Sequence, residues 1–125
     1  MSARFFHEYL PLSGKGSERV IAVVRFPGDS DWFSGHFPGN PIVPGVALIA
    51  LAAEAVVERE RGEGRSLAVT GVRRVRFRLP VRPDDEVTLE VVPMANPKGP
   101  SYAFTVRLAG ETACSGILTA EIVPS

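Results

Sequence analysis

Hydrophobic residues in this 125-residue chain form one long apolar run and several shorter runs rich in β-branched and aromatic residues. The long run starts at Pro44 and continues to about Arg61, before Gly62, and its helix-forming residues predict a helix. Its first three turns are apolar on all sides, so we expect protein to surround it, whereas Glu58–Arg61 marks a solvated end. The β-rich runs, bounded by Pro, Gly, Asp or Asn, predict strands at Arg19–Phe26, Leu67–Val81, Glu86–Met94, Tyr102–Leu108 and Ala113–Val123.

An apolar helix followed by a meander of strands predicts one α+β domain over residues 1–125, with an antiparallel sheet curled around the helix. A chain of this length buries one core and leaves no room for a second domain. Such a sheet ends in edge strands, and proteins seldom leave long apolar edges exposed. Pairing with a second copy would cover them, so we expect a homodimer.

Composition narrows the possible partners and the compartment. The formal net charge is zero, which gives no electrostatic basis for binding nucleic acid or an anionic membrane. The single cysteine, Cys114, lies in a strand-like apolar run and is expected to be a buried thiol in a reducing compartment. The apolar run is too short to span a bilayer and no secretory signal is evident, so we expect a soluble cytoplasmic protein. Metal-ligand spacings and phosphate-binding glycine loops are absent from the sequence, so we expect no metal and no other cofactor.

The segment before the predicted helix carries the candidate chemistry. Residues 35–46 read GHFPGNPIVPGV, in which three prolines fix the backbone and the glycines leave it free. Such a loop can hold the His36 ring in one place. The amides of Gly45 and Val46 belong to the first helical turn and lack acceptors inside the helix, and a glycine lets a ligand carbonyl come close. An imidazole beside these amides suits acyl or thioester chemistry.

This loop resembles the active-site loop of the hot-dog-fold 3-hydroxyacyl-acyl-carrier-protein dehydratases of fatty-acid and polyketide synthesis. The family pattern is His-Phe-Pro, two residues, Pro, two residues, Pro-Gly-Val, and residues 36–46 fill every fixed position. Asp31–Gly35 resembles the start of that loop, and Val75–Asp85 resembles the family segment Arg-Phe-x-x-Pro-Val-x-Pro-Gly-Asp. The resemblance covers roughly residues 18 to 122. It implies a hot-dog fold and a dimer in which each active site takes its histidine from one subunit and its helix acid from the other.

The implied reaction is dehydration of 3-hydroxyacyl thioesters, held on acyl carrier protein or coenzyme A, to trans-2-enoyl thioesters. His36 would remove the Cα proton while the Gly45 amide polarises the thioester carbonyl. Phe37 beside the histidine either packs in the core or forms a wall or gate of the acyl tunnel. The candidate substrate-binding residues are Gly45, Val46, Phe37 and Ala50.

One position departs from the family pattern. The family's catalytic Glu or Asp lies fourteen positions after the histidine, where this chain has Ala50. Glu54 shares the helical face of Ala50 one turn further along, so it is the candidate acid that would protonate the leaving hydroxide. Alternatively, Glu54 hydrogen-bonds a neighbour or reaches solvent. Without a helix acid, the protein would be a weakly active or non-catalytic thioester-binding subunit that pairs with an active hot-dog homologue.

A row of basic residues is the last candidate site. In the segment RVRFRLP, arginines alternate with apolar residues, at Arg74, Arg76 and Arg78. Alternation predicts that the three guanidinium groups share one strand face opposite the core. This row is either a solvated face or a docking patch for the phosphopantetheine phosphate or an acidic carrier protein, which Arg73, Arg82 and Lys98 could extend.

Overall fold

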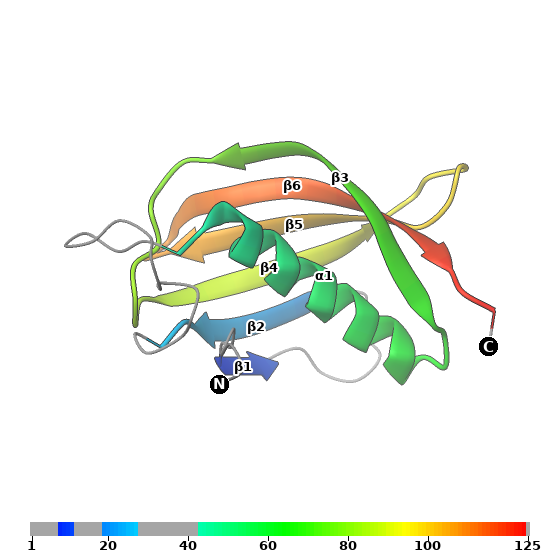
Figure 1. Cartoon of the computed structure of the whole chain (residues 1–125), viewed down its shortest axis with the longest axis horizontal. Helices are drawn as coiled ribbons and strands as arrows, with labels where there is room; N and C mark the ends of the chain where they lie inside the picture. The colour runs from blue at the N-terminus through cyan, green and yellow to red at the C-terminus, as the bar shows by residue number, and fades with distance from the viewer. Residues whose placement is uncertain (1–7, 12–18, 28–42, 125) are drawn as a thin grey trace, which may run out of the picture.

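The computed structural model describes residues 8–11, 19–27 and 43–124. Within these residues, a six-stranded sheet, antiparallel throughout, curls around one helix (Figure 1). The helix is α1 (Gly45–Gly62), and the strands are β1 (Glu8–Pro11), β2 (Val20–Arg25), β3 (Leu67–Phe77), β4 (Glu86–Met94), β5 (Ser101–Leu108) and β6 (Glu111–Ile122). Their spatial order, β1-β2-β4-β5-β6-β3, places β1 and β3 at the two edges. The sequence predicts this sheet around a helix, and β1 is an additional strand.

The end of α1 differs slightly from the prediction. The helix includes Gly62, and the left-handed backbone that follows it is taken by Gly64, with φ of 81°. The carbonyl oxygen of Glu60 then accepts hydrogen bonds from the amides of Glu63 and Arg65, at N–O distances of 3.0 and 2.8 Å, and these bonds close the last turn. The predicted end at about Arg61 therefore lies one residue before the observed end, and Gly64 rather than Gly62 makes the reversal.

Two strand boundaries move by two residues or more, and the others by at most one. β3 stops at Phe77 rather than Val81, because the amides of Arg78 and Leu79 both bond to the carbonyl of Ala113, at 2.8 and 3.3 Å. β6 begins at Glu111, earlier than predicted, after a turn whose residues 109 and 110 have φ of 51° and 83°. Positive φ at two successive residues is typical of the tight turns that join two strands as a hairpin, here β5 and β6.

The core lies between α1 and the concave face of the sheet. Alternate residues of the central strands point toward the helix, because successive side chains of a strand lie on opposite faces of the sheet. The largest side chains that are fully buried are Phe26, Leu51, Leu89, Phe104 and Leu118.

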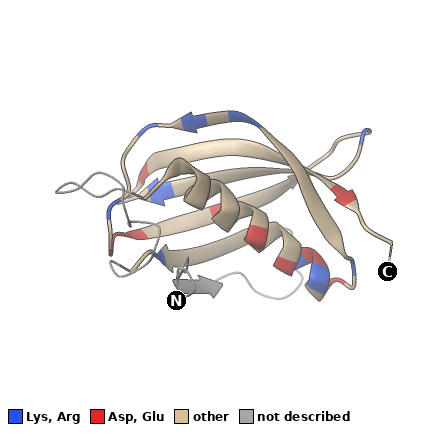
Figure 2. Cartoon of the chain, viewed as in Figure 1, with Lys and Arg blue, Asp and Glu red and all other residues tan. Residues whose placement is uncertain are grey.

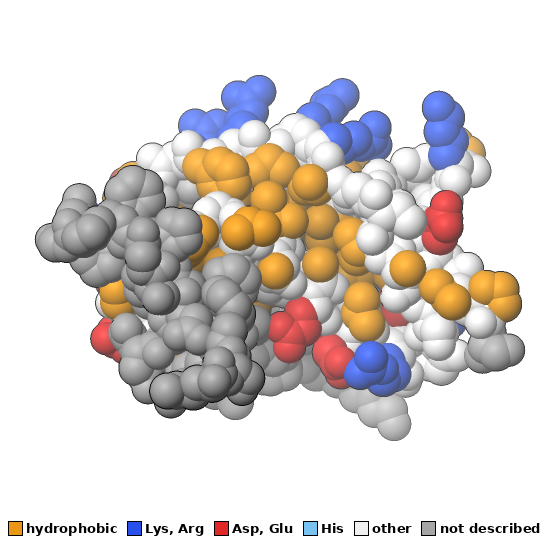
Figure 3. Space-filling model, viewed as in Figure 1, with side chains coloured by type: hydrophobic (Ala, Val, Ile, Leu, Met, Phe, Trp, Pro, Cys, Tyr) orange, Lys and Arg blue, Asp and Glu red, His pale blue; other side chains and the backbone are white. Residues whose placement is uncertain are grey.

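The sheet covers only one side of α1, so the prediction that protein surrounds the helix is wrong for the single chain. Ala47, Leu51 and Val56 are buried against the sheet. Val46, Ala50 and Glu54, spaced one turn apart, are exposed, with Val46 at 64%. We call these three residues the outer stripe of α1. Figure 3 shows hydrophobic side chains gathered on this face of the molecule.

Candidate functional site

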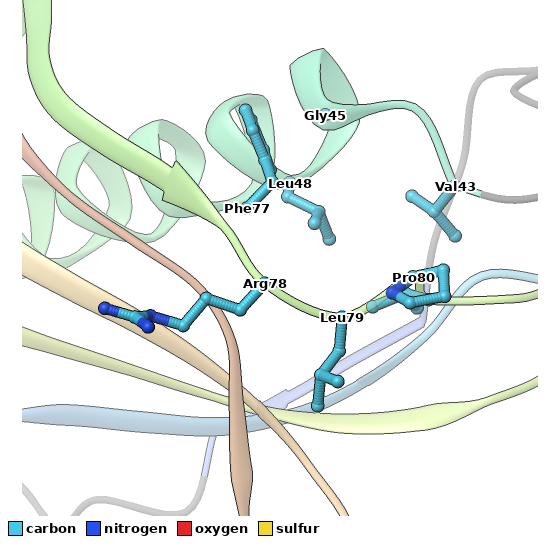
Figure 4. A pocket seen from close by; sticks show the side chains of 8 residues that line it. Val43, Gly45, Leu48, Phe77, Arg78, Leu79 and Pro80 are labelled. Atoms are coloured by element: carbon cyan, nitrogen blue, oxygen red, sulfur yellow. The ribbon is translucent and has the colours of Figure 1, made fainter.

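A cavity of about 400 Å³ lies beside the N-terminus of α1 (Figure 4). The segment before the helix, its first turn and the chain after β3 contribute the lining residues, which are Val43, Gly45, Leu48, Phe77, Arg78, Leu79, Pro80 and Val81. The Val43 amide donates to the Val81 carbonyl at 2.6 Å, which fixes the segment before the helix against the chain after β3. The lining is apolar apart from Arg78, whose side chain extends away from Val43 and Pro80 in Figure 4. A cavity of this size and character suits an acyl group.

The first turn of α1 supplies hydrogen-bond donors at this cavity. No side chain caps the helix, and the Ala47 amide bonds to the Pro44 carbonyl at 2.9 Å. The amides of Gly45 and Val46 therefore have no acceptor inside the helix. They also lie at the positive end of the helix dipole, which favours developing negative charge on a ligand oxygen.

Phe77 explains why position 45 is a glycine. A Cβ atom built on Gly45 would lie 2.6 Å from Cζ and 2.8 Å from Cε1 of the Phe77 ring. The space left by the missing side chain is thus filled by this ring, whereas the sequence suggested that a ligand carbonyl would use it. Phe77 itself is 55% exposed and lines the cavity, although simple alternation places it in the core. Its position in the family-like segment Val75–Asp85 was the only sequence signal for this role.

The predicted residues His36 and Phe37 lie outside the described residues. Ala50 and Glu54 are described, and neither lines the cavity beside Gly45. Glu54 follows Gly45 by nine residues, which is about 13 Å along a helix that rises 1.5 Å per residue. A glutamate side chain does not span that distance, so Glu54 does not reach the Gly45 amide of its own chain.

A β-bulge breaks the predicted row of arginines. Arg73 and Arg76 are separated by two residues, Arg74 and Val75, whereas their pairing partners in β6 are separated only by Gly116. Val75 packs against the core and Arg74 takes φ of 56° within the bulge. The predicted shared face for Arg74, Arg76 and Arg78 is therefore wrong at Arg74, because the bulge inserts one extra residue. Arg73 and Arg76 lie opposite β6 residues that alternate with buried ones, so both project from the outer face of the sheet.

The arginines divide into two groups by their partners. The first group forms ion pairs: Arg19 with Glu90, Arg25 with Asp84, Arg61 with Glu58, and both Arg59 and Arg65 with Glu60. The second group forms no ion pair with a carboxylate in the described part of the chain, and comprises Arg73, Arg74, Arg76, Arg78, Arg82 and Arg107. Figure 2 shows cationic residues along β3, and Figure 3 shows their side chains along one margin of the surface. The second group is thus available to an external anion.

Glu60 is buried, although the sequence places it in the solvated end of the helix. Its side chain is 4% exposed and forms ion pairs with Arg59 and Arg65. Burial alone would raise the pKa of Glu60, but hydrogen bonds from Arg65 and Tyr102 and the charges of the two arginines lower it below its ordinary value of 4.5. Glu60 therefore joins the end of α1 to β5 and to the chain that leads into β3.

Other chemistry is limited in the residues that the structure describes. No group of His, Cys, Asp and Glu within residues 8–11, 19–27 and 43–124 is arranged to hold a metal ion. That same part of the chain contains no helix with the length and hydropathy of a membrane span. Cys114 is fully buried, as predicted, and burial raises the pKa of its thiol to about 11.

Comparison with known proteins identifies relatives over most of the chain. The ApeI-like family, described as ApeI dehydratase, matches residues 13–117. A 3-hydroxyacyl-[acyl-carrier-protein] dehydratase FabZ of Oenococcus oeni is 36% identical over 107 residues, covering 81% of this chain and 76% of the relative. The FabZ of Bacillus pumilus is 29% identical over 119 residues, covering 90% and 82%.

Solved structures show the same fold. The dehydratase heterocomplex ApeI:P from Xenorhabdus doucetiae matches with a TM-score of 0.73 at 22% identity, covering 90% of this chain and 97% of that chain. A Streptococcus mutans protein bound to acetyl coenzyme A matches with a TM-score of 0.77 at 10% identity, covering 98% and 94%. These likenesses confirm the predicted hot-dog fold.

Proposed function

Because the chain belongs to the ApeI-like dehydratase family, we propose that it converts 3-hydroxyacyl thioesters on acyl carrier protein to trans-2-enoyl thioesters. The observation that carries this proposal is the apolar cavity beside the amides at the start of α1. The cavity accommodates the acyl chain, and the Gly45 amide donates a hydrogen bond to the thioester carbonyl oxygen.

The reaction follows from these groups. Neutral His36 removes the Cα proton, and negative charge develops on the thioester oxygen, where the Gly45 amide and the helix dipole stabilise it. The electron pair then forms the Cα–Cβ double bond as the bond between Cβ and the hydroxyl oxygen breaks. Glu54 protonates the departing hydroxide, which leaves as water. His36 then loses its proton to solvent and Glu54 takes one up from solvent, which restores the starting state.

Glu54 acts on the partner subunit's substrate in this proposal. Glu54 is too far from Gly45 along the helix to reach the Gly45 amide of its own chain, and it lies on the exposed outer stripe of α1, which a second chain could cover. The edge strand β3 supports a dimer as well, because Val72 and Phe77 are 42% and 55% exposed there. A homodimer that covers this face would bring each Glu54 toward the cavity of the other chain.

Turnover of a purified 3-hydroxyacyl carrier-protein thioester, followed by the absorbance of the enoyl product, tests the assignment. His36→Ala should lower kcat by roughly 100- to 10,000-fold. Glu54→Gln should lower it strongly without changing the fold, because the amide keeps the size of the side chain but cannot deliver a proton. Glu58→Gln is the matched control, since Glu58 lies one turn further along α1, and it should retain full activity. No turnover of any chain length by the folded protein would exclude the proposal.

Ala50 favours a second candidate, a thioester-binding subunit that works with an active homologue. Ala50 lies on the outer stripe of α1, at the position of the family's acid, and a methyl group cannot donate a proton. Such a chain would show little activity alone and regain it when mixed with a hot-dog homologue that has an acid at this position. Ala50→Glu should then raise the dehydration rate of the isolated protein. High activity of the unmodified homodimer would exclude the subunit hypothesis.

A further inference from the structure

A second cavity, of about 490 Å³, opens on the outer face of the sheet and differs in character from the one at α1. Its lining residues are all polar: Arg78, Thr105, Arg107, Thr112 and Ser115. They come from β5, β6 and the chain that follows β3. Two guanidinium groups and three hydroxyls therefore line one open hollow on this face.

The strand register explains this convergence. Arg107 lies directly opposite Thr112, and Thr105 lies opposite Ser115. On the other side of β6, the Arg78 amide is bonded to the Ala113 carbonyl at 2.8 Å. The two arginines thus flank β6 from both sides, at a backbone separation of roughly 10 Å, or two strand spacings. Arginine side chains are long enough to meet over β6 from that separation.

The charges at this cavity are not balanced by nearby carboxylates. Neither Arg78 nor Arg107 has an acidic partner among the described residues. Glu90, which lies opposite Thr105, is paired with Arg19 at 3.3 Å. Glu111 adjoins Thr112 in β6, and strand alternation places it on the opposite face. Two cations brought together without a counter-charge favour a bound anion.

We propose that this outer-face cavity binds a phosphate group. Two guanidinium forks and three hydroxyls offer more donors than the two oxygens of a carboxylate can accept, whereas a tetrahedral phosphate presents an oxygen to each side. The cavity exceeds the size of a phosphate ion and so has room for an attached organic group. Arg78 lines both cavities, which places a phosphate held here beside the acyl site. The source would then be the phosphate of a pantetheine arm, an identification that rests on the proposed function.

Calorimetric titration of the full chain with inorganic phosphate, at constant ionic strength against chloride, tests the site. The wild type should bind phosphate saturably. Arg107→Gln should weaken binding at least about tenfold, because a charge-assisted hydrogen-bond donor is lost. Thr112→Val, which keeps the shape of the side chain, should also weaken it. Arg73→Gln is the matched control, since Arg73 is exposed on the same outer face but does not line the cavity, and it should leave binding unchanged.

Two further titrants separate the sources of phosphate. Tighter binding of 4′-phosphopantetheine than of inorganic phosphate, together with no binding of pantetheine, would support the pantetheine arm. Equal binding of 4′-phosphopantetheine and inorganic phosphate would overturn that source and support a site for phosphate alone. Phosphate binding no better than chloride, or unaffected by Arg107→Gln in a folded protein, would overturn the site. These titrations involve no turnover, so failure of the dehydration assay would leave the site standing.

Discussion

The buried carboxylate of Glu60 should be a principal source of the stability of this fold. Glu60 is 3% exposed, and its partner Arg59 has a side chain only 17% exposed, so solvent screens their ion pair only weakly. Glu60→Gln keeps the size of the side chain but removes its charge. Breaking a buried ion pair by removing one partner costs about 3–5 kcal/mol. We expect about 3 kcal/mol here, because Arg65 is 47% exposed and can regain water.

This loss corresponds to a large thermal shift. An unfolding entropy of about 2.1 cal/mol/K per residue gives about 0.26 kcal/mol/K for 125 residues. A loss of about 3 kcal/mol therefore lowers Tm by about 12 °C. Glu58→Gln is the control, because its ion pair with Arg61 is exposed on both sides and contributes at most about 1 kcal/mol.

The effect should also depend on pH. The pKa of Glu60 in the folded protein lies below its ordinary value of 4.5, so its ionisation stabilises the fold fully above that value. The contribution disappears as the pH falls through the lower pKa of the folded state. Urea unfolding followed by circular dichroism should thus show the widest gap between wild type and Glu60→Gln near neutral pH and a shrinking gap in acid. A gap no larger than that of Glu58→Gln, or one that acid leaves unchanged, would refute the reasoning.

Two further predictions concern packing. The buried Cys114 thiol, with a pKa of about 11, should resist alkylation in the native protein at neutral pH and react only after unfolding. Mass spectrometry of the alkylated protein measures this, and rapid labelling of the native protein would contradict the burial of Cys114. Gly45→Ala should cost about 1 kcal/mol, because its Cβ meets the Phe77 ring, which is half-exposed and can shift, and Phe77→Ala should remove that cost. A double-mutant cycle in urea checks this coupling, and equal effects of Gly45→Ala in both backgrounds would disprove it.

Local signals in the sequence predict most of the fold. β4 spans Glu86–Met94 as predicted, because buried residues alternate with more exposed ones as far as Val91 and turn residues bound the strand. α1 follows from a run of helix-forming residues after Pro44. The pattern at residues 36–46 also predicts the dehydratase family, since its prolines and glycines form a rare combination. These features depend on residues close together in the chain, so the sequence alone determines them.

Contacts between distant segments decided the remaining features. The bulge at Arg74 arises from pairing with β6, and a shift of one residue changes which arginines share a face. The burial of Glu60 depends on Arg65 and on Tyr102 in the distant strand β5, and the Phe77 ring meets Gly45 only because β3 runs past the start of α1. Arg78 and Arg107 likewise flank β6 through a register that no local pattern encodes. Periodicity in a sequence tells which residues face one side of an element, whereas the packing of the elements decides what each side meets.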